Sequence, residues 1–519
     1  MGETTSSPLP PGLDLIQFDG YAGLNTNASR VGIEDSQMYI CDGFMPVGKS
    51  WSRTMYGIGT AVWNSASGGL AGVSFFQSFN IGYTQYLAIF LTDGSIWVAN
   101  TSNSTTTMIA AAGTITYPST GNVGVTQWNS TYLLIVANQT NGYFAWDGTT
   151  FYATGATVPG IGVMPAGIQG TGITTYLGRV WIIYGNLLTF SAAASFVDFA
   201  TSDGGGVTPS NDSTLRVQYV GIVSTNGFLY LIGDSSVSYV SNVTSSVSGG
   251  TTTTTFTVQN ADPQTGTPYS SSLTLIGQDV AFSNAYGVHV SYGGRVTKIS
   301  DDLDGIYSTV PNFGGVSPSA GTAVLFGKRV LVVLALIIDQ VTLQPVYKLL
   351  LWDRKKWWTS NQDIPLTFIG TSELDSVLTC YGTDGNQIVP LFQKPSANFS
   401  KTMQSKLFAR PHYALGKAAS RLFGVVQYYS FASTNISMSI DNETGSSTPI
   451  VVGPDTLTWD ITWTGLSWFL INTTSGVLVI DPVAIGQAGA LIGMTVTTNA
   501  SDAAILSLAV VTKPVQYRG

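Results

Sequence analysis

Side chains able to perform acid–base or metal chemistry are sparse in this chain. Its two histidines, His289 and His412, have no second residue at the spacing that zinc ligands use. The acidic run Asp301-Asp302-Leu303-Asp304 could offer carboxylate oxygens to Ca²⁺, but it lacks the alternation and the distal Glu of an EF-hand loop. We interpret both histidines as structural and the acidic run as a solvated loop, with Ca²⁺ binding as the alternative.

Three Asp-Gly pairs, Asp93-Gly94, Asp147-Gly148 and Asp384-Gly385, each lie between apolar stretches. Glycine accepts the positive φ of a tight hairpin turn, and aspartate bonds to the turn backbone. These aspartates are therefore predicted to form turns. Since no phosphate-binding loop or nucleophile elbow is present either, the sequence predicts no catalytic, cofactor-binding or metal-binding residue and no enzyme activity.

Charge is scarce and mostly acidic. Charged residues make up 10% of the chain, against roughly 25% in an average globular protein, and the formal net charge is −8. A protein that grips nucleic-acid phosphates needs clustered Lys and Arg, so sequence-specific DNA binding is not expected. The densest basic run, Arg354-Lys355-Lys356, is interpreted as a solvated turn, although it could contact DNA, lipid or an acidic neighbour. Passive contact with DNA stays open, because a mildly acidic surface repels a passing duplex and keeps it from sticking.

The remaining composition indicates a folded chain without disulfides or membrane spans. Cys41 and Cys380 are interpreted as free thiols, with one long-range disulfide as the alternative. The longest apolar run, 330–338, has the length of a strand, far below the ~20 residues of a membrane helix, so no membrane insertion is expected. Trp357, Trp358, Trp463 and Trp468 could stack on sugars, but such rings more often fill protein cores.

Seven hairpin-like units succeed one another through the middle of the chain. Each reads as an apolar strand, a turn, and a second strand rich in β-branched and aromatic residues. Their spacing of roughly 40 to 50 residues is the blade period of β-propellers. The units cover residues 86–100, 132–152, 176–190, 221–240, 277–300, 321–359 and 377–392.

After residue 400 the repeat stops, and alternating strands typical of an antiparallel β-sandwich follow. The predicted fold is all-β: a β-propeller of about six to eight blades in residues 66–400, and a β-sandwich platform domain in residues 401–519. Residues 1–65 lie outside the repeat and are predicted to form an N-terminal arm that packs with the C-terminal domain.

Several motifs along the chain have a familiar order. Gly23-Leu24-Asn25-Thr26 is followed by Cys41-Asp42-Gly43-Phe44 and Ser52-Arg53, and then by stretches 190–201 (FSAAASFVDFAT), 281–300 (AFSNAYGVHVSYGGRVTKIS) and 349–359 (LLLWDRKKWWT). Together these motifs resemble the tail nozzle (tail tubular protein B-like) β-propeller proteins of short-tailed bacteriophages. Ser52-Arg53 carries only part of that family's basic segment, and no long inserted tip domain is present. These two differences leave open the alternative that the chain is a related tail hub, stopper or fibre-attachment protein.

The resemblance implies a structural virion protein of the phage tail, made in the host cytoplasm. It implies a hexameric ring that binds a portal-adaptor protein and tail fibre proteins, with genomic DNA passing through the ring's channel during ejection. The alternative function is that of a glycan-binding propeller, a lectin or receptor-binding tail protein. These expectations come from the resemblance, and the residues themselves predict only the all-β, non-catalytic character.

Overall fold

A computed structural model of the chain describes residues 14–18, 22–47, 51–65, 69–209, 218–293, 295–307, 317–340, 342–374, 377–393, 399–409, 416–428, 436–452, 476–484, 488–500 and 502–515. Regular structure in these residues is almost entirely β-strand, with one short helix, α1 (Asp304–Tyr307). No helix in the described part of the chain is long and apolar enough to cross a membrane. The predicted all-β class is confirmed.

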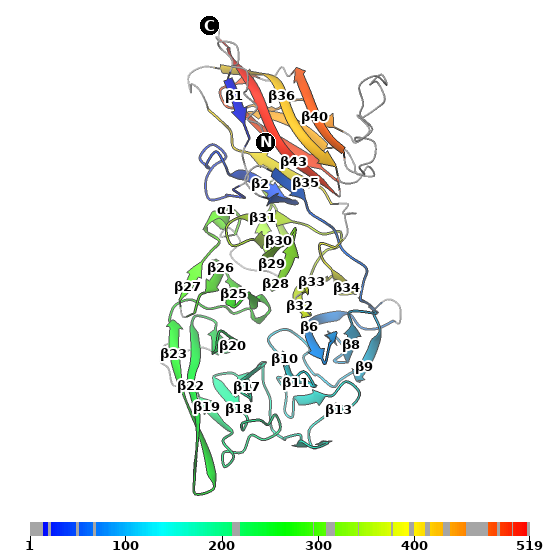
Figure 1. Ribbon diagram of the computed structural model, residues 1–519, viewed down its shortest axis with the longest axis vertical. Helices are drawn as coiled ribbons and strands as arrows, with labels where there is room; N and C mark the ends of the chain where they lie inside the picture. The colour runs from blue at the N-terminus through cyan, green and yellow to red at the C-terminus, as the bar shows by residue number, and fades with distance from the viewer. Residues whose placement is uncertain are drawn as a thin grey trace.

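Seven four-stranded antiparallel units follow one another around the lower body of the molecule (Figure 1). Each of the seven predicted hairpin repeats lies in one of these units, in order, and the fold is a β-propeller. The units, numbered one to seven here, are β6 (Val73–Ile81) to β9 (Thr106–Ala110), β10 (Val123–Trp128) to β13 (Phe151–Tyr152), β16 (Gly172–Tyr176) to β19 (Gly206–Pro209), β20 (Tyr219–Thr225) to β23 (Thr251–Asp262), β24 (Thr274–Ile276) to β27 (Val296–Lys298), β28 (Ser319–Leu325) to β31 (Trp357–Ser360), and β32 (Phe368–Leu374) to β34 (Gln387–Pro390) with β5 (Trp63–Asn64).

The seventh unit is completed by a strand from the other end of the chain. β34 pairs with the two-residue strand β5, so that Ile388 lies opposite Trp63. The Val62 amide also donates to the Ile388 carbonyl at 2.9 Å. This pairing closes the propeller, and it places the start of the propeller before the expected boundary at residue 66.

Aromatic side chains and Asp-Gly turns explain why these segments form stacked sheets. Trp146 of the second unit packs against Phe79 and Tyr86 of the first, with ring centroids 6.0 and 5.9 Å apart. At the turn of the first unit, the Asp93 carboxylate accepts the Ser95 amide at 2.9 Å. Gly94 follows with φ +82°, where a Cβ would lie 2.2 Å from a backbone oxygen. The turn therefore needs glycine, as the sequence predicts.

Apart from β14 (Thr157–Val158) and β15 (Gly162–Val163), which form a two-stranded sheet of their own, the remaining strands form an upper domain that contains both described ends of the chain (Figure 1). One sheet has the order β3-β4-β43-β36-β40, with β1 also paired to β43; the other has the order β2-β35-β42-β37. Side chains of both sheets, among them Leu422 and Val510 on one and Met438 and Val496 on the other, belong to one buried apolar cluster. The strands are β1 (Asp14–Gln17), β2 (Met38–Asp42), β3 (Phe44–Val47), β4 (Trp51–Thr54), β35 (Lys401–Ser405), β36 (Gly416–Tyr428), β37 (Ile436–Asn442), β40 (Gly476–Ala484), β42 (Gly493–Thr498) and β43 (Ala503–Val515).

The sixth propeller unit continues into the upper domain without a break. Its outermost strand, β31, pairs in parallel with β2 through Thr359 and Asp42. The result is a ten-stranded sheet that runs from β28 in the propeller to β37 and its neighbours in the upper domain. The propeller and the upper domain are therefore joined by backbone hydrogen bonds as well as by the chain itself.

Candidate functional site

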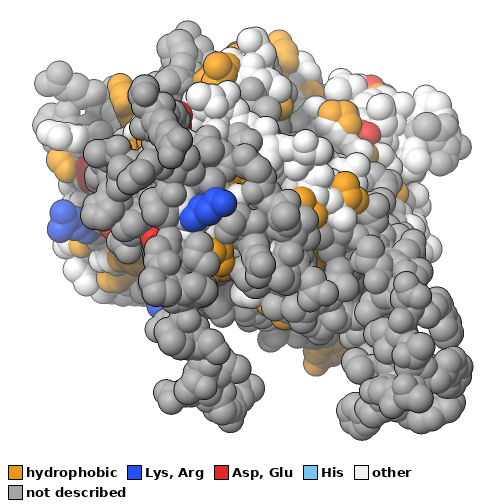
Figure 2. Space-filling model, turned by 90° about the horizontal axis from the view of Figure 1, so that it is seen from above, with side chains coloured by type: hydrophobic (Ala, Val, Ile, Leu, Met, Phe, Trp, Pro, Cys, Tyr) orange, Lys and Arg blue, Asp and Glu red, His pale blue; other side chains and the backbone are white. Residues whose placement is uncertain are grey.

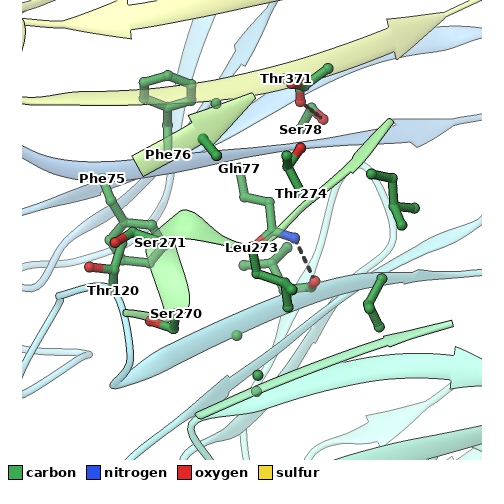
Figure 3. Close-up of a pocket in the computed structure, with 18 of the residues that line it drawn as sticks. Phe75, Phe76, Gln77, Ser78, Thr120, Ser270, Ser271, Leu273, Thr274 and Thr371 are labelled. Carbon is green, nitrogen blue, oxygen red and sulfur yellow. Dashed lines mark hydrogen bonds between the residues drawn. The ribbon is translucent and has the colours of Figure 1, made fainter. Parts of the chain in front are cut away.

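The propeller axis holds a cavity of about 490 Å³, lined by residues of the innermost strand of every unit. Figure 3 shows Gln77 and Ser78 at this cavity, where Gln77 Nε2 donates to the Val125 carbonyl at 2.9 Å and Ser78 Oγ to the Thr371 carbonyl at 2.7 Å. These bonds join the first unit to the second and the seventh. The axial polar groups thus hold neighbouring units together.

The chemistry offered by this lining is neutral. Among the described residues around the cavity, Arg329 is the one charged side chain, and no Asp, Glu or His takes part. The described part of the chain also contains no group of three or more His, Cys, Asp or Glu placed to hold a metal ion. A hydrolase would need convergent carboxylates, and this cavity supplies none.

Residues that the sequence singled out lie apart from the axis. His289 is buried in β26 (Gly287–Ser291), stacked on the Phe282 ring with centroids 5.6 Å apart. Burial lowers the pKa of His289 to about 4. His412 lies outside the described residues, as do Trp463 and Trp468. Both described tryptophans of the pair 357–358 are fully buried, at 1% and 0% exposure, so neither can stack on a sugar.

A lysine bridges two carboxylates of the acidic run. Lys298 Nζ lies 3.3 Å from Asp301 Oδ1 and 2.5 Å from Asp304 Oδ1, so an ammonium group occupies the space between two of the candidate Ca²⁺ ligands. The carbonyl of Asp302 accepts the Thr26 amide at 2.7 Å. The run therefore binds the N-terminal segment, which the sequence alone did not indicate.

The basic turn also contacts a neighbouring unit. Arg354, at φ +75°, donates through Nη2 to the Ile276 carbonyl at 2.9 Å and lies 3.2 Å from Asp279 Oδ2. Both partners belong to the fifth propeller unit. The expectation of a merely solvated turn is wrong for Arg354, because its side chain joins units five and six.

Cys41 and Cys380 are free thiols, as predicted, and both are buried. Burial raises the pKa of each thiol above its ordinary value.

The junction between propeller and upper domain contains an ion cluster that sequence reasoning missed. Lys348, in β30 (Pro345–Trp352), places Nζ 2.8 Å from Asp42 Oδ2 and 2.6 Å from Asp339 Oδ2. Thr359 Oγ1 donates to the other Asp42 oxygen at 2.9 Å. Burial by itself lowers the pKa of Lys348, but the two carboxylates outweigh it and raise that pKa above its ordinary value. The sequence did contain a signal for this cluster, namely a lysine inside the apolar stretch 347–352 (YKLLLW).

A second contact at the junction involves Arg53. Its guanidinium lies over the ring of Phe326, 4.3 Å from the centroid, and bonds to Asp502 Oδ1 at 3.0 Å. Phe326 belongs to the turn between β28 and β29 (Lys328–Ile338) of the sixth unit, whereas Asp502 precedes β43. One side chain thus links the propeller to the last strand of the chain.

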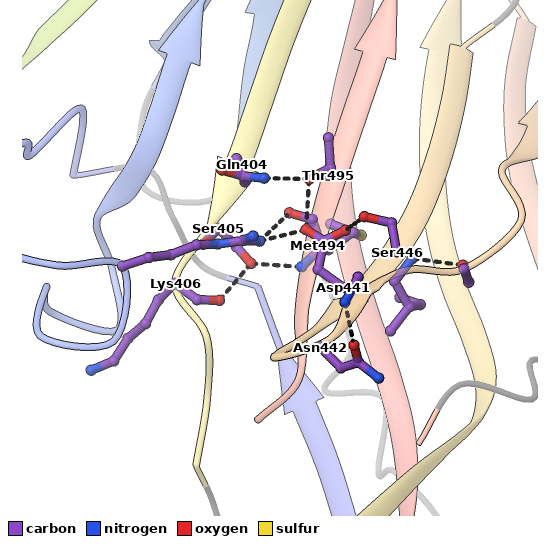
Figure 4. A network of polar contacts seen from close by, with 12 residues as sticks. Gln404, Ser405, Lys406, Asp441, Asn442, Ser446, Met494 and Thr495 are labelled. Carbon is purple, nitrogen blue, oxygen red and sulfur yellow. Dashed lines mark hydrogen bonds and ion pairs between the residues drawn. The ribbon is translucent and has the colours of Figure 1, made fainter. Parts of the chain in front are cut away.

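The N-terminal segment is fixed to the upper domain by a buried carboxylate. Asp441, 2% exposed, accepts Arg30 Nη2 at 2.5 Å, Thr495 Oγ1 at 2.6 Å and Ser446 Oγ at 2.7 Å. Arg30 Nε also donates to the Ser405 carbonyl at 2.7 Å. Figure 4 shows Asp441 between Thr495 and Ser446 on neighbouring strands. Both carboxylate oxygens of Asp441 accept hydrogen bonds. The network therefore holds the N-terminal segment against the strands of the upper domain.

Strand order and closure define the class of this protein: an all-β chain built on a β-propeller. No protein-family model matches the sequence, and no curated protein matches it.

The solved structures to which this fold is similar are β-propeller proteins. The β-propeller domain of Cps50 (Swd1) from Myceliophteria thermophila is 10% identical, with 63% of this chain and 98% of that chain covered and a TM-score of 0.37. YCF48 bound to D1 peptide is 9% identical, with 69% and 100% covered and a TM-score of 0.38. The N-terminal domain of Nup159 is 12% identical, with 68% and 99% covered and a TM-score of 0.33. At these scores the likenesses carry no argument about function.

Proposed function

We propose that this chain is a structural subunit of a bacteriophage tail, a nozzle-like protein whose copies form a hexameric ring around the path of the DNA. The ring binds a portal-adaptor protein and tail fibre proteins in the virion, retains the genome and lets it pass at ejection. In this proposal the upper domain is an antiparallel β-sandwich platform formed by the N-terminal arm and the C-terminal strands, and the subunit catalyses no reaction.

One observation carries the proposal: the motifs that resemble the tail proteins contact one another in the folded chain. Although Leu24 and Trp357 are 333 positions apart in the chain, four of the six motifs meet at the junction: 23–26, 41–44, 281–300 and 349–359. The Leu24 amide donates to the Trp357 carbonyl at 2.7 Å, and the Gly43 amide to the Thr359 carbonyl at 2.8 Å. Trp357 Nε1 in turn donates to the Ile299 carbonyl at 2.7 Å. The stretch 190–201 lies in the third propeller unit.

Close packing accounts for the glycine at the start of the first motif. Gly23 has φ +101°, and a Cβ there would lie 2.8 Å from the Trp357 carbonyl oxygen. Only glycine fits both the conformation and the space. The motif is thus explained by its contact with the sixth propeller unit, which supports a shared architecture as the source of the resemblance.

The size of the axial cavity determines where DNA could pass. The axial cavity of about 490 Å³ is smaller than the space that even a short piece of DNA duplex fills. The innermost strands also approach closely, since a Cβ on Gly124 would lie 2.7 Å from Gly172 Cα. The DNA channel in the proposal therefore runs between copies of the chain and not along the axis of one propeller.

Among the described residues at the upper end, few charged side chains face outward (Figure 2). Figure 2 shows this end of the molecule, where Lys, Arg, Asp and Glu are few among the coloured side chains. The Arg30, Arg53 and Lys348 side chains are engaged inside the structure. A weakly charged, net acidic subunit suits a wall past which DNA slides without sticking.

The test is the mass and shape of the purified full chain. Light scattering after size-exclusion chromatography is expected to give six times the 54.8 kDa of one copy, and electron microscopy a six-fold ring with an open centre. A single-copy mass at all concentrations would refute the ring. Saturable binding on a glycan array by that single copy would instead support the lectin alternative.

A further inference from the structure

One hairpin extends well beyond the propeller. β22 (Val237–Ser248) and β23 (Thr251–Asp262) continue as a two-stranded ribbon, and in Figure 1 its tip lies at the end of the molecule away from both termini. The turn is Gly249-Gly250, with φ +59° and +82°. Two positive φ values at a two-residue turn match the twist of the ribbon. A bulge lies between Ser241 and Thr244, and the pairing is regular from Thr244 to the tip.

The ribbon has one open edge. β21 (Phe228–Gly233) pairs with β22 only as far as Val240, so residues 242–248 have β23 as their one partner strand in the described structure. A two-residue turn is closed by a hydrogen-bonded pair, here Ser248 and Thr251. Alternation then directs the N–H and C=O groups of Ser245 and Val247 away from β23. Residues 244–248 are all exposed, and Val247 is 73% exposed.

The ribbon is held in a fixed position by the third propeller unit. Arg179, 2% exposed, donates to Ser245 Oγ at 2.7 Å and to the Gly204 carbonyl at 2.8 Å. The Thr252 amide donates to the Ser202 carbonyl at 2.8 Å, and Thr254 Oγ1 to the Gly204 carbonyl at 2.7 Å. One of these contacts holds a side chain of β22, Ser245, and two others hold β23. None of them uses the outward backbone groups of Ser245 and Val247.

Natural edge strands carry charges, proline, a β-bulge or a covering loop that prevents pairing with another chain. The bulge of β22 lies between Ser241 and Thr244, before the open edge. The sequence from Ser235 to Ala261 contains no charged residue and no proline. An exposed, regular and uncharged edge is a template for β-augmentation by a partner strand.

A matching edge lies across the propeller. β9, the outermost strand of the first unit, pairs only with β8 (Ile96–Asn100). Its residues Thr106 and Thr107 are exposed, and Met108 is 51% exposed. No charged residue occurs from Gly94 to Trp146. In Figure 1, β9 and the ribbon lie on opposite sides of the propeller.

We propose that the β22 edge of one copy pairs with the β9 edge of the next copy, which forms the contact between neighbours in the ring. This rests on the proposed ring function and adds its interface. The next copy is the fitting occupant because two uncharged edges bring no like charges together at the contact, although each chain carries a net charge of −8. Two different surfaces on opposite sides of one subunit are also what a head-to-tail ring requires.

Two substitutions of Val247 separate edge pairing from side-chain effects. Val247→Pro removes the outward N–H, and proline is tolerated at a free strand edge. Val247→Thr, the matched control, keeps the N–H and the strand preference. Light scattering of the full chain should show the ring mass for wild type and Val247→Thr, and a loss of ring for Val247→Pro, with the dissociation constant between copies raised at least about tenfold.

A charge pair tests the partner strand. Val247→Lys alone should weaken the ring, and Thr107→Glu in the same chain should restore it, because the two positions then carry opposite charges on facing edges. Circular dichroism and thermal unfolding check that each variant is folded.

If folded Val247→Pro keeps the full ring mass, the ribbon contact is refuted while the ring stands. If Thr107→Glu does not rescue Val247→Lys, β9 is the wrong partner. A single-copy wild type refutes the ring itself.

Discussion

Replacing Lys348 by methionine tests whether the junction cluster holds the propeller and the upper domain together. The side chains of Lys348, Asp42 and Asp339 are only 9, 12 and 13% exposed, so water screens them little. Removal of the ammonium takes away the cation that lies within 2.8 Å of both buried carboxylates. Breaking one partner of a buried ion pair typically costs about 3–5 kcal/mol, and we expect the free energy of unfolding at pH 7 to fall by that amount.

The assay is urea unfolding at pH 7, followed by tryptophan fluorescence. Lys355→Met is the matched control, because Lys355 is exposed in the turn after the same strand, and it should stay within about 0.5 kcal/mol of wild type. A Lys348→Met chain equally close to wild type would show that the cluster does not stabilise the junction.

The pH dependence supplies an independent check. The pKa of Lys348 is raised in the folded chain, so its stabilisation is complete below the ordinary lysine pKa of about 10.4 and is lost as pH rises through the folded value. The difference between wild type and Lys348→Met should therefore be constant from pH 7 to about pH 10 and shrink at higher pH. A difference that persists unchanged in strong alkali would contradict the charge-based account.

Three further results are expected. Gly124→Ala should lower stability by about 1–3 kcal/mol in thermal unfolding, because its Cβ meets the next innermost strand, whereas Gly32→Ala, whose nearest contact is 3.4 Å, should change it little. Wild type should lose on the order of 3 kcal/mol as pH falls from about 6.5 to 4, since the pKa of buried His289 is lowered to about 4 and the unfolded chain takes up the proton first; His289→Phe should flatten this slope. Cys41 and Cys380 should both resist a thiol reagent until denaturant is added, and a fast native reaction would contradict their burial.

Local patterns were enough to predict the propeller. Each repeat is a hairpin whose strands and turn are adjacent in sequence, so alternation and pairs such as Asp93-Gly94 report the structure directly. The same reasoning failed for Arg354, because whether a turn residue is solvated depends on the neighbouring unit and not on the turn.

Long-range pairings left no such signal. β5 is two residues long and closes the propeller only because Ile388, 325 positions after Trp63, lies opposite it. The partners Arg30 and Asp441 are 411 positions apart. Nothing in the sequence near either residue specifies the other. Lys348 did leave a signal in the sequence, since a lysine in an apolar strand needs a buried counter-charge. The sequence does not show, however, which two carboxylates are its partners.

The order of the strands along the chain also sets an order for folding during synthesis. Domains generally fold as units while the N-terminal part emerges first. The propeller can close as soon as β34 is made, because β5 already exists. In contrast, β1 and β4 both pair with β43, which is made long after them. A product truncated before β43 thus carries a closed propeller and an unfinished upper domain, and only chains that include β43 can present both sheets of the upper domain.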